Sequence, residues 1–405
     1  MVPLEIRPVG AAEVDDFRRA DLRGFGVAPA APGGPRTWTE AELDRTRAAI
    51  EDGEIVGTSR AYSFELTLPG GGVVPAAAVS WVAVIPTHRR RGVLTRMIEA
   101  LHADARAREE PVAVLTASEG AIYGRFGYGV AAWRLGVEAD RARVRFRDEV
   151  RAGRLRMIDA AEAAEVLPAV YDRLRRARAG AVSRPATWWP EEYFARVRTD
   201  QAVFFVVHED TSGAADGFVA YEITGGWDGG LPDRRLRVFD LQAAAPGVRA
   251  ALWRYVFGVD LVASVAGDDL PVDEPLRHLV TDPRRVRVRY VNDGLWLAPL
   301  DPRALLAARR YAPRADRLVV EVHQPDGARA RLAVEGEDRD AACVPTTEEA
   351  DLSCSAAALG AVALGGNRWS ELAQAGTVAA RDGRTLARAD AMFASSPAAA
   401  STSWF

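Results

Sequence analysis

The sequence predicts a chain of three parts, two α/β layers of one design followed by a small α+β domain. In the first part, strand-like runs alternate with an amphipathic helix, as in an α/β layer. The same order of paired strands, long strand and helix returns in the second part, and the third changes to short strands and Ala-rich helices. A length of 405 residues agrees with two or three domains. We expect boundaries at 1–145, 146–295 and 296–405.

The first part is predicted from hydrophobic periodicity and turn residues. Pro69-Gly70-Gly71-Gly72 separates two apolar runs and indicates a hairpin. After Gly92, the residues Leu94, Met97, Ile98, Leu101 and Ala105 form one apolar stripe of a helix. In chain order, the predicted elements are strand 4–7, helix 12–24, a Pro- and Gly-rich loop at 28–35, helix 40–50, strands 57–68 and 73–84, the helix after Gly92, strand 112–116, a short helix at 120–125 and strand 131–137.

The second and third parts follow a charge-rich boundary at 139–154. The second part repeats the first, but its strand-to-helix turn, Ala243 to Gly247, has no cation and contains a proline that removes one backbone N–H. We expect this copy to be unable to hold a phosphate. The predicted elements are helix 188–196, strands 202–208, 217–223 and 235–241, helices 248–256 and 303–311, strands 318–323 and 330–334, and helices 368–375 and 386–393.

Composition narrows the classes of function. The formal net charge is −4, which gives no basic field for nucleic acid. All 52 basic residues are arginine, so phosphate binding through a Walker-A lysine is excluded. Neither the two cysteines nor the five histidines have the spacing of a metal site. No apolar run is long enough to cross a membrane. We expect a cytoplasmic protein with no metal and a small anionic partner.

Three arginines stand between the strand that ends at Val84 and the helix that begins after Gly92. A helix start presents free N–H groups and the positive end of the helix dipole, so Arg89 to Arg91 would repel one another there unless an anion is bound. Gly92 would let the backbone approach that anion closely. The turn therefore predicts a pyrophosphate site, although a run of charges can also simply face solvent.

The string Val82-x-Val84-x₄-Arg89-Arg90-Arg91-Gly92-Val93-Leu94 resembles motif A of the GNAT N-acetyltransferases, whose R/Q-x-x-G-x-G/A loop holds the pyrophosphate of acetyl-CoA. Leu94 departs from the usual Gly or Ala. The strings PTHRRRG, Ala117 to Gly129 and Asp293 to Leu297, with an aromatic chain end, resemble the Eis acetyltransferases over essentially the whole chain. That resemblance implies two GNAT-like domains, a domain like sterol carrier proteins and a homohexamer.

The resemblance also implies roles for individual residues. The strand residues would pair with the pantetheine amides, the turn and helix start would bind the pyrophosphate, and two residues after the next strand would lie beside the acetyl end. The implied acetyl-CoA-binding residues are Val82, Ala83, Val84, Arg89, Arg90, Arg91, Gly92, Val93, Leu94, Thr95, Ser118 and Glu119.

Acetyl transfer to an amine needs a base for the amine and a proton donor for the departing thiolate. The Eis resemblance implies Tyr123 as the general acid and the carboxylate of Phe405 as the general base, with Trp404 and Phe405 buried so that they fix the chain end. By residue type alone, Tyr123 could be a core tyrosine and the last residues could be frayed.

The predicted function is an acetyl-CoA-dependent N-acetyltransferase of small amines, including aminoglycosides. Some Eis relatives have an acidic residue where Trp404 stands, so we expect an altered substrate preference. Two alternatives remain open at this stage. One is an acyl-CoA or lipid-binding module without catalysis, and the other is a protein lysine N-acetyltransferase.

Overall fold

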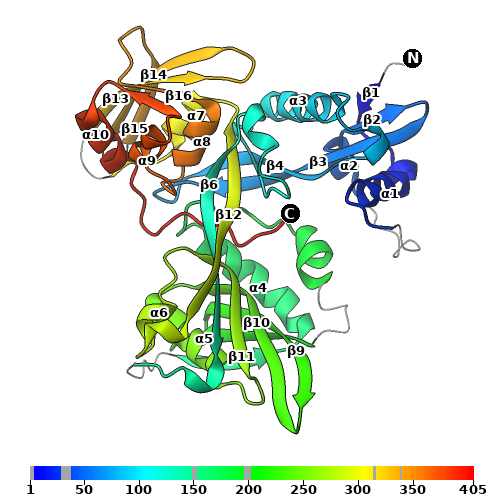
Figure 1. Ribbon diagram of the computed structural model, residues 1–405, viewed down its shortest axis with the longest axis vertical. Coiled ribbons are helices and arrows are strands. Elements are labelled where there is room, and N and C mark those ends of the chain that lie inside the picture. Colours follow the sequence, from blue (N-terminus) through cyan, green and yellow to red (C-terminus); the bar gives the residue numbers. More distant parts are fainter. Residues whose placement is uncertain (1–3, 29–37, 148–152, 196–201, 313–315, 338–339) are drawn as a thin grey trace.

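The structure, a computed structural model of the 405-residue chain, describes all residues except 1–3, 29–37, 148–152, 196–201, 313–315 and 338–339. The predicted loop at 28–35 lies almost entirely outside the described residues. In Figure 1 the first part of the chain extends to the upper right, the third lies at the upper left and the second forms the lower body.

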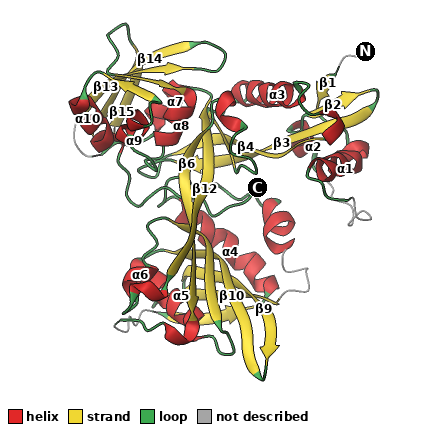
Figure 2. Cartoon of the chain, viewed as in Figure 1, coloured by secondary structure: helices red, strands yellow, loops and turns green. Residues whose placement is uncertain are grey.

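A single twelve-stranded sheet runs through the first two parts, in the order β1-β2-β3-β4-β5-β12-β6-β11-β10-β9-β8-β7. Figure 2 shows this sheet as the continuous spine of the lower and right-hand bodies. The elements of the first part are β1 (Glu5–Arg7), η1 (Ala11–Glu13), α1 (Val14–Gly24), α2 (Glu40–Asp44), β2 (Ala48–Glu51), β3 (Glu54–Thr67), β4 (Val73–Val84), η2 (Pro86–His88), α3 (Val93–Ala107), β5 (Val112–Leu115), η3 (Tyr123–Phe126) and β6 (Gly129–Asp140).

The second part repeats this arrangement. Its elements are η4 (Arg141–Arg143), β7 (Arg154–Ile158), α4 (Ala160–Arg175), the π-helical turn η5 (Trp189–Tyr193), β8 (Ala202–Glu209), β9 (Ala215–Asp228), β10 (Leu231–Ala243), α5 (Pro246–Gly258), β11 (Ser264–Pro271), α6 (Leu276–Leu279), η7 (Pro283–Arg285) and β12 (Arg287–Pro299). In each part a long strand pairs in parallel with the strand that follows its helix, β4 with β5 and β10 with β11.

The two parts exchange one strand each. Strand β12, from the end of the second part, pairs with β5 of the first, while β6 of the first part pairs with β11 of the second. The two exchanged strands also pair with each other along most of their length. Each α/β layer is therefore completed by a strand of the other, and one sheet joins them.

The third part is a five-stranded sheet, in the order β15-β14-β13-β16-β17, with helices packed on it. Its elements are α7 (Pro302–Ala308), β13 (Asp316–His323), β14 (Arg329–Glu337), β15 (Asp340–Pro345), β16 (Leu352–Ser355), α8 (Ala356–Val362), α9 (Trp369–Gln374), β17 (Val378–Ala380) and α10 (Gly383–Phe393). The predicted order of two α/β layers and an α+β domain is confirmed.

Several predicted elements need correction. The helix expected over 40–50 ends at Asp44, and Ala48–Glu51 is a strand because it pairs with β1 and β3. The helix expected at 120–125 is the shorter η3 at Tyr123–Phe126. Helix α4 was not predicted, and its internal Pro168 is unfavourable in a helix. Strands β7 and β11 were also missed.

Within the ranges described here, no helix combines the length and the apolar character that a membrane span would need.

Candidate active site

A bulge in β4 opens the sheet beside the predicted site. Along the β3–β4 pair, Thr58 faces Ala83 and Arg60 faces Ser80, so β4 contains one extra residue. Trp81 lies at this bulge with a left-handed φ of 54°. Strand β4 pairs with β5 only from Ala76 to Ala78. Beyond the bulge, β4 therefore has an edge that β5 does not cover, and the residues on it are the predicted Val82 to Val84.

The helix that follows begins with a glycine in a conformation that other residues rarely adopt. Gly92 is the N-cap of α3 with a φ of 77°, and no side chain caps the helix. A Cβ atom at Gly92 would meet nothing within 4 Å, so its backbone angle and not crowding favours glycine. The first turn contains no acidic residue. The uncapped N–H groups and the helix dipole therefore leave room for an external anion.

The three arginines of this turn have different partners. Arg89 donates to the carbonyls of Gly24 at 2.5 Å and Val84 at 3.1 Å, so its side chain connects α1 to the end of β4. Arg91 forms an ion pair with Glu51 at 2.7 Å, and the other oxygen of the same carboxylate lies 2.9 Å from Nε2 of His88. Among the described residues, Arg90 has no hydrogen-bond or ion-pair partner and its side chain is exposed. Its guanidinium group is available to a ligand.

These features border a cavity of about 660 Å³. Nearly all of the predicted acetyl-CoA-binding residues line it. Arg91 does not, because its side chain is held by Glu51. The predicted residues on the cavity wall are Val82, Ala83, Val84, Arg89, Arg90, Gly92, Val93, Leu94, Thr95, Ser118, Glu119 and Tyr123.

Sequence reasoning missed part of the wall. Gly24 and Phe25 come from the end of α1, and Ile122 and Arg125 flank Tyr123. The apolar residues beside a motif can be suspected from their proximity in sequence, as for Ile122. Nothing in the sequence brings the end of α1 next to β4, because that contact depends on how the helix packs on the sheet.

Tyr123 lies between two cavities. Besides the larger one, it lines a second of about 190 Å³, and Phe25, Val82 and Ser118 also border both. The ring is 6% exposed and packs edge-on against Tyr128 at 5.8 Å. Burial, with a smaller contribution from the charge of Glu119, raises the pKa of Tyr123 to about 12. The phenol therefore keeps its proton at neutral pH.

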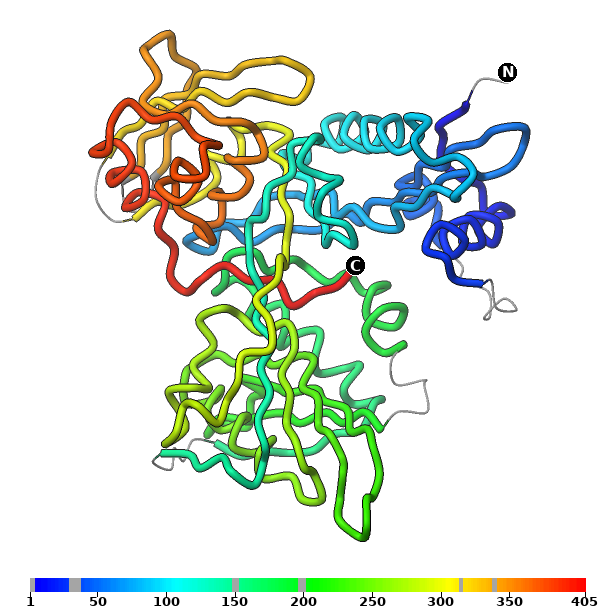
Figure 3. Tube along the Cα trace, in the orientation of Figure 1, coloured from blue at the N-terminus to red at the C-terminus, as the bar shows by residue number. Residues whose placement is uncertain are grey.

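The end of the chain lines the smaller cavity. Trp404 and Phe405 are both on its wall, opposite residues of β4 and Tyr123. Figure 3 shows the last residues crossing the centre of the molecule and ending between the first two parts. Phe405 packs edge-on against Phe64 of β3 at 5.3 Å. The two predicted catalytic residues, distant in sequence, thus share one cavity.

The expected burial of both terminal aromatic residues is only half right. Phe405 is partly buried, but Trp404 is 40% exposed. The Trp404 indole donates to Asp269 at 2.6 Å, and the Arg134 guanidinium lies 4.1 Å above its ring. Polar contacts, and not burial of the indole, hold Trp404.

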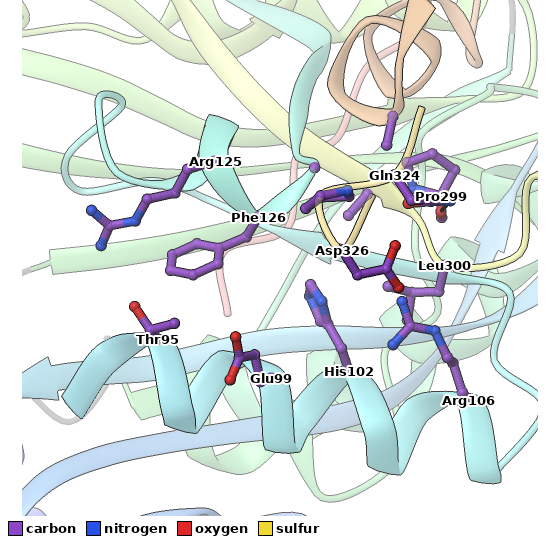
Figure 4. Close-up of a pocket in the computed structure, with 14 residues that line it drawn as sticks. Thr95, Glu99, His102, Arg106, Arg125, Phe126, Pro299, Leu300, Gln324 and Asp326 are labelled. Carbon is purple, nitrogen blue, oxygen red and sulfur yellow. Dashed lines mark hydrogen bonds between the residues drawn. The ribbon is translucent and has the colours of Figure 1, made fainter. Parts of the chain in front are cut away.

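A further cleft of about 290 Å³ lies along α3 (Figure 4) and shares Thr95 and Arg125 with the larger cavity. Gln324 and Asp326 reach it from the turn after β13, so the third domain forms one of its walls. His102, on the α3 wall, bonds the buried Tyr128 hydroxyl at 2.9 Å. Burial first, and then the charge of Arg106, lowers the pKa of His102 to about 4.

No group of three or more His, Cys, Asp or Glu side chains is placed to hold a metal within the described part of the chain. Both cysteines are buried and free.

Comparison with known families defines the class of protein. Residues 5–131 and 180–327 each match a family model described as an acetyltransferase (GNAT) domain. Residues 302–401 match a sterol carrier protein domain. The chain is therefore built from two GNAT domains followed by a sterol-carrier-like domain, and it is an N-acetyltransferase.

Similar proteins identify the family. The chain is 37% identical over 410 residues to an uncharacterised N-acetyltransferase of Streptomyces coelicolor, covering 97% of each. It is 36% identical over 351 residues to the N-acetyltransferase Eis of Mycobacterium tuberculosis, covering 84% of each. The crystal structure of Eis1 from Mycobacterium abscessus superposes with a TM-score of 0.87 at 34% identity, over 99% of this chain and all of that one. The chain belongs to the Eis family of GNAT N-acetyltransferases.

Proposed function

We propose that this protein transfers the acetyl group of acetyl-CoA directly to the amine of a small molecule, with Tyr123 as general acid and the Phe405 carboxylate as general base. One observation carries the proposal. The cavity beside the helix start and the cavity beside the chain end meet at Phe25, Val82, Ser118 and Tyr123. A donor bound in the first and an acceptor bound in the second would have their reacting groups at this junction.

Acetyl-CoA fits the larger cavity by its chemistry. The pyrophosphate would accept hydrogen bonds from the free backbone N–H groups after Gly92 and from the guanidinium of Arg90. The pantetheine amides would add along the uncovered edge of β4, as an extra strand does. Arg89 would act by holding that edge in place, through its bonds to Val84 and Gly24. GNAT acetyltransferases use acetyl-CoA as cosubstrate.

In the reaction, the amine nitrogen forms a bond to the thioester carbonyl carbon and the carbon–sulfur bond breaks. The proton lost by the amine goes to the Phe405 carboxylate, and the sulfur takes up the proton of the Tyr123 hydroxyl, which solvent then replaces. A phenol with a pKa of about 12 is a weaker acid than a thiol of about 8.5. The hydrogen bond from Tyr123 to the sulfur, as negative charge develops there, is therefore its chief contribution.

The part of the site proposed for the amine acceptor suits a positively charged molecule that lies among aromatic rings. A cavity of about 240 Å³ adjoins the chain end. Its wall contains Glu192, Thr402 and Arg184, whose charge is paired with Asp240, and the aromatic residues Trp188, Tyr193, Phe239, Trp404 and Phe405. A carboxylate within an aromatic wall suits an amine with further positive charge. We include aminoglycosides among the acceptors on this ground and on that of the family resemblance. Trp404 would contribute stacking where some relatives contribute charge.

Three further properties belong to the proposal. We assign the domains to 1–145, 146–295 and 296–405, and the assembly to a homohexamer by resemblance to the Eis family. Free buried cysteines agree with a reducing, cytoplasmic location.

The test is a thiol-release assay with acetyl-CoA across a panel of monoamines, polyamines and aminoglycosides. Tyr123→Phe should lower kcat about 100-fold, with acetyl-CoA binding retained. Tyr255→Phe is the matched control, since it removes a hydroxyl in the second domain whose one hydrogen bond within the described ranges is to Tyr221. A chain lengthened by one glycine after Phe405 moves the carboxylate and should lose activity similarly. Full activity of the lengthened chain would contradict the assignment of the base.

The same assay separates the alternatives. Binding of acyl-CoA with no thiol release from any amine would favour a binding module. Turnover confined to lysine-containing peptides would favour a protein acetyltransferase.

A further inference from the structure

The last residues of the chain are fixed by the second domain. The Ser403 hydroxyl accepts from the Arg184 guanidinium at 3.0 Å and lies 3.0 Å from the Tyr171 hydroxyl. Tyr171 itself donates to the carbonyl of Val182, so the Ser403 hydroxyl donates to Tyr171. Ser403 thus both donates and accepts a hydrogen bond, and it is only 3% exposed.

Arg184 is the centre of this arrangement. It forms an ion pair with Asp240 at 2.9 Å, and each side chain is 1% exposed. The rings of Tyr171, Trp188 and Trp189 lie 3.7, 4.9 and 5.1 Å from the guanidinium carbon. A buried cation with a carboxylate on one side and aromatic faces around it has a fixed position. The group that binds Ser403 is therefore rigid.

The second contact region is the gap between β10 and β11. These strands last pair at Val238 and Gly267. Just beyond, Gln242 donates to Thr402 at 3.0 Å, and Asp269 accepts from Trp404 at 2.6 Å. In the first domain the corresponding gap, between β4 and β5, borders the cavity proposed for acetyl-CoA. The second gap is contacted by the protein's own chain end.

Arg184 is also fixed to the first domain. The segment just before it bonds to the end of β3, where Thr67 donates to Ala181 at 2.9 Å and Ser183 donates to Glu65 at 2.8 Å. The backbone next to Arg184 is therefore bonded to the first domain, while the Arg184 side chain contacts Asp240 of the second domain and Ser403 of the chain end.

We propose that the second GNAT domain serves as a dock for the end of the chain, and that Arg184 and Ser403 are positioning residues that place the Phe405 carboxylate at the active site. The proposal rests on the proposed function for its effect on catalysis. Its structural part, that Ser403 holds the end of the chain, stands without it.

The test compares Ser403→Ala with Ser401→Ala in the full-length protein. The Ser401 hydroxyl is also buried, but it has no hydrogen-bond partner in the part of the chain that the structure describes, which makes it a matched control. Loss of a hydrogen bond to a charged group should lower kcat of Ser403→Ala about 10-fold while KM for acetyl-CoA stays unchanged. Ser401→Ala should retain the parent kcat.

A second measurement does not depend on catalysis. The rate at which carboxypeptidase releases Phe405 should rise about 10-fold in Ser403→Ala and stay at the parent rate in Ser401→Ala. An unchanged rate of release in Ser403→Ala would overturn the dock. Faster release with unchanged kcat would support the dock and contradict the assignment of Phe405 as the base, so the two failures are distinguishable.

Discussion

The two GNAT domains have the same backbone design at the point where acetyl-CoA would bind, but different residues. In each, a long strand carries one extra residue, in β4 at Trp81 and in β10 at Phe239, and leaves its parallel neighbour just beyond. In the first domain the next helix begins with Gly92 at a positive φ, and nearby Arg90 has no partner among the residues that the structure describes. In the second it begins with Pro246 after uncharged Ala245. The backbone creates the gap, and the residues at the helix start decide whether it suits an anion.

The largest expected effect is on the free energy of unfolding, when a buried carboxylate of the second domain is neutralised. Asp240, in the second domain, pairs with buried Arg184, so Asp240→Asn leaves an unpaired buried cation. We expect a loss of about 3–5 kcal/mol in the free energy of unfolding, measured by urea denaturation. Asp233→Asn, at an exposed position of the same strand, should change it by less than about 0.5 kcal/mol. Equal effects of the two substitutions would show that the pair is not a fixed part of the second domain.

The helix starts can be compared directly by matched substitutions. Gly92→Val places a branched side chain at a φ of 77°, which costs about 2 kcal/mol of backbone strain. The backbone relieves this strain by moving the N–H groups of the helix start, so acetyl-CoA binding should weaken about 30-fold. Gly247→Val lies in the first turn of α5, outside the proposed site, and should leave binding unchanged. Isothermal titration with acetyl-CoA measures both.

The first domain has a half-buried carboxylate that forms no ion pair with any cation among the described residues. Burial raises the pKa of Asp21 to about 6, although a hydrogen bond from Thr58 opposes the shift. The folded state therefore holds a proton that the unfolded state releases near pH 4, and stability falls as the pH rises from about 4 to 6. Asp21→Asn should remove this dependence, with a gain of about 2 kcal/mol at pH 7 and almost none at pH 4.

Urea denaturation of Asp21→Asn at several pH values checks this prediction. Asp15→Asn, at an exposed position of the same helix, serves as the control. A gain that is the same at pH 4 and pH 7 would contradict the raised pKa.

The smallest expected effect is a difference in acetyl-CoA affinity between substitutions of two neighbouring arginines. Arg90→Ala removes the unpaired cation and should weaken acetyl-CoA binding about 5-fold, less so at high salt. Arg91→Ala removes a side chain that pairs with Glu51, and its effect should be below about 2-fold. The reverse order would show that the ion pair with Glu51 breaks when the ligand binds.

The arginine turn and the family resemblance together pointed to most of the residues that line the larger cavity. The turn residues before Val73 and the apolar run up to Val84 predicted the bounds of β4 correctly, and the stripe through Met97, Ile98 and Leu101 is the buried face of α3. These features depend on residues close in the chain. The residues that line the cavity came mainly from a motif that is continuous in sequence.

Features that depend on distant contacts were not predictable. The alanines of Ala48–Glu51 favour a helix, yet pairing with β1 and β3 makes them a strand. The exchange of β6 and β12 leaves no local signal, because either strand would fit its own domain. The Arg184 network joins Asp240 and Ser403, which a single sequence gives no reason to connect.

The exchanged strands have a consequence for any attempt to divide the protein. A fragment that ends before β12 would leave β5 with an open edge, and it would also expose the edge of β6 that β12 covers. Such unpaired edges promote aggregation. The first domain should therefore fold well only when residues 287–299 are supplied, either in the same chain or as a separate peptide that restores the missing strand.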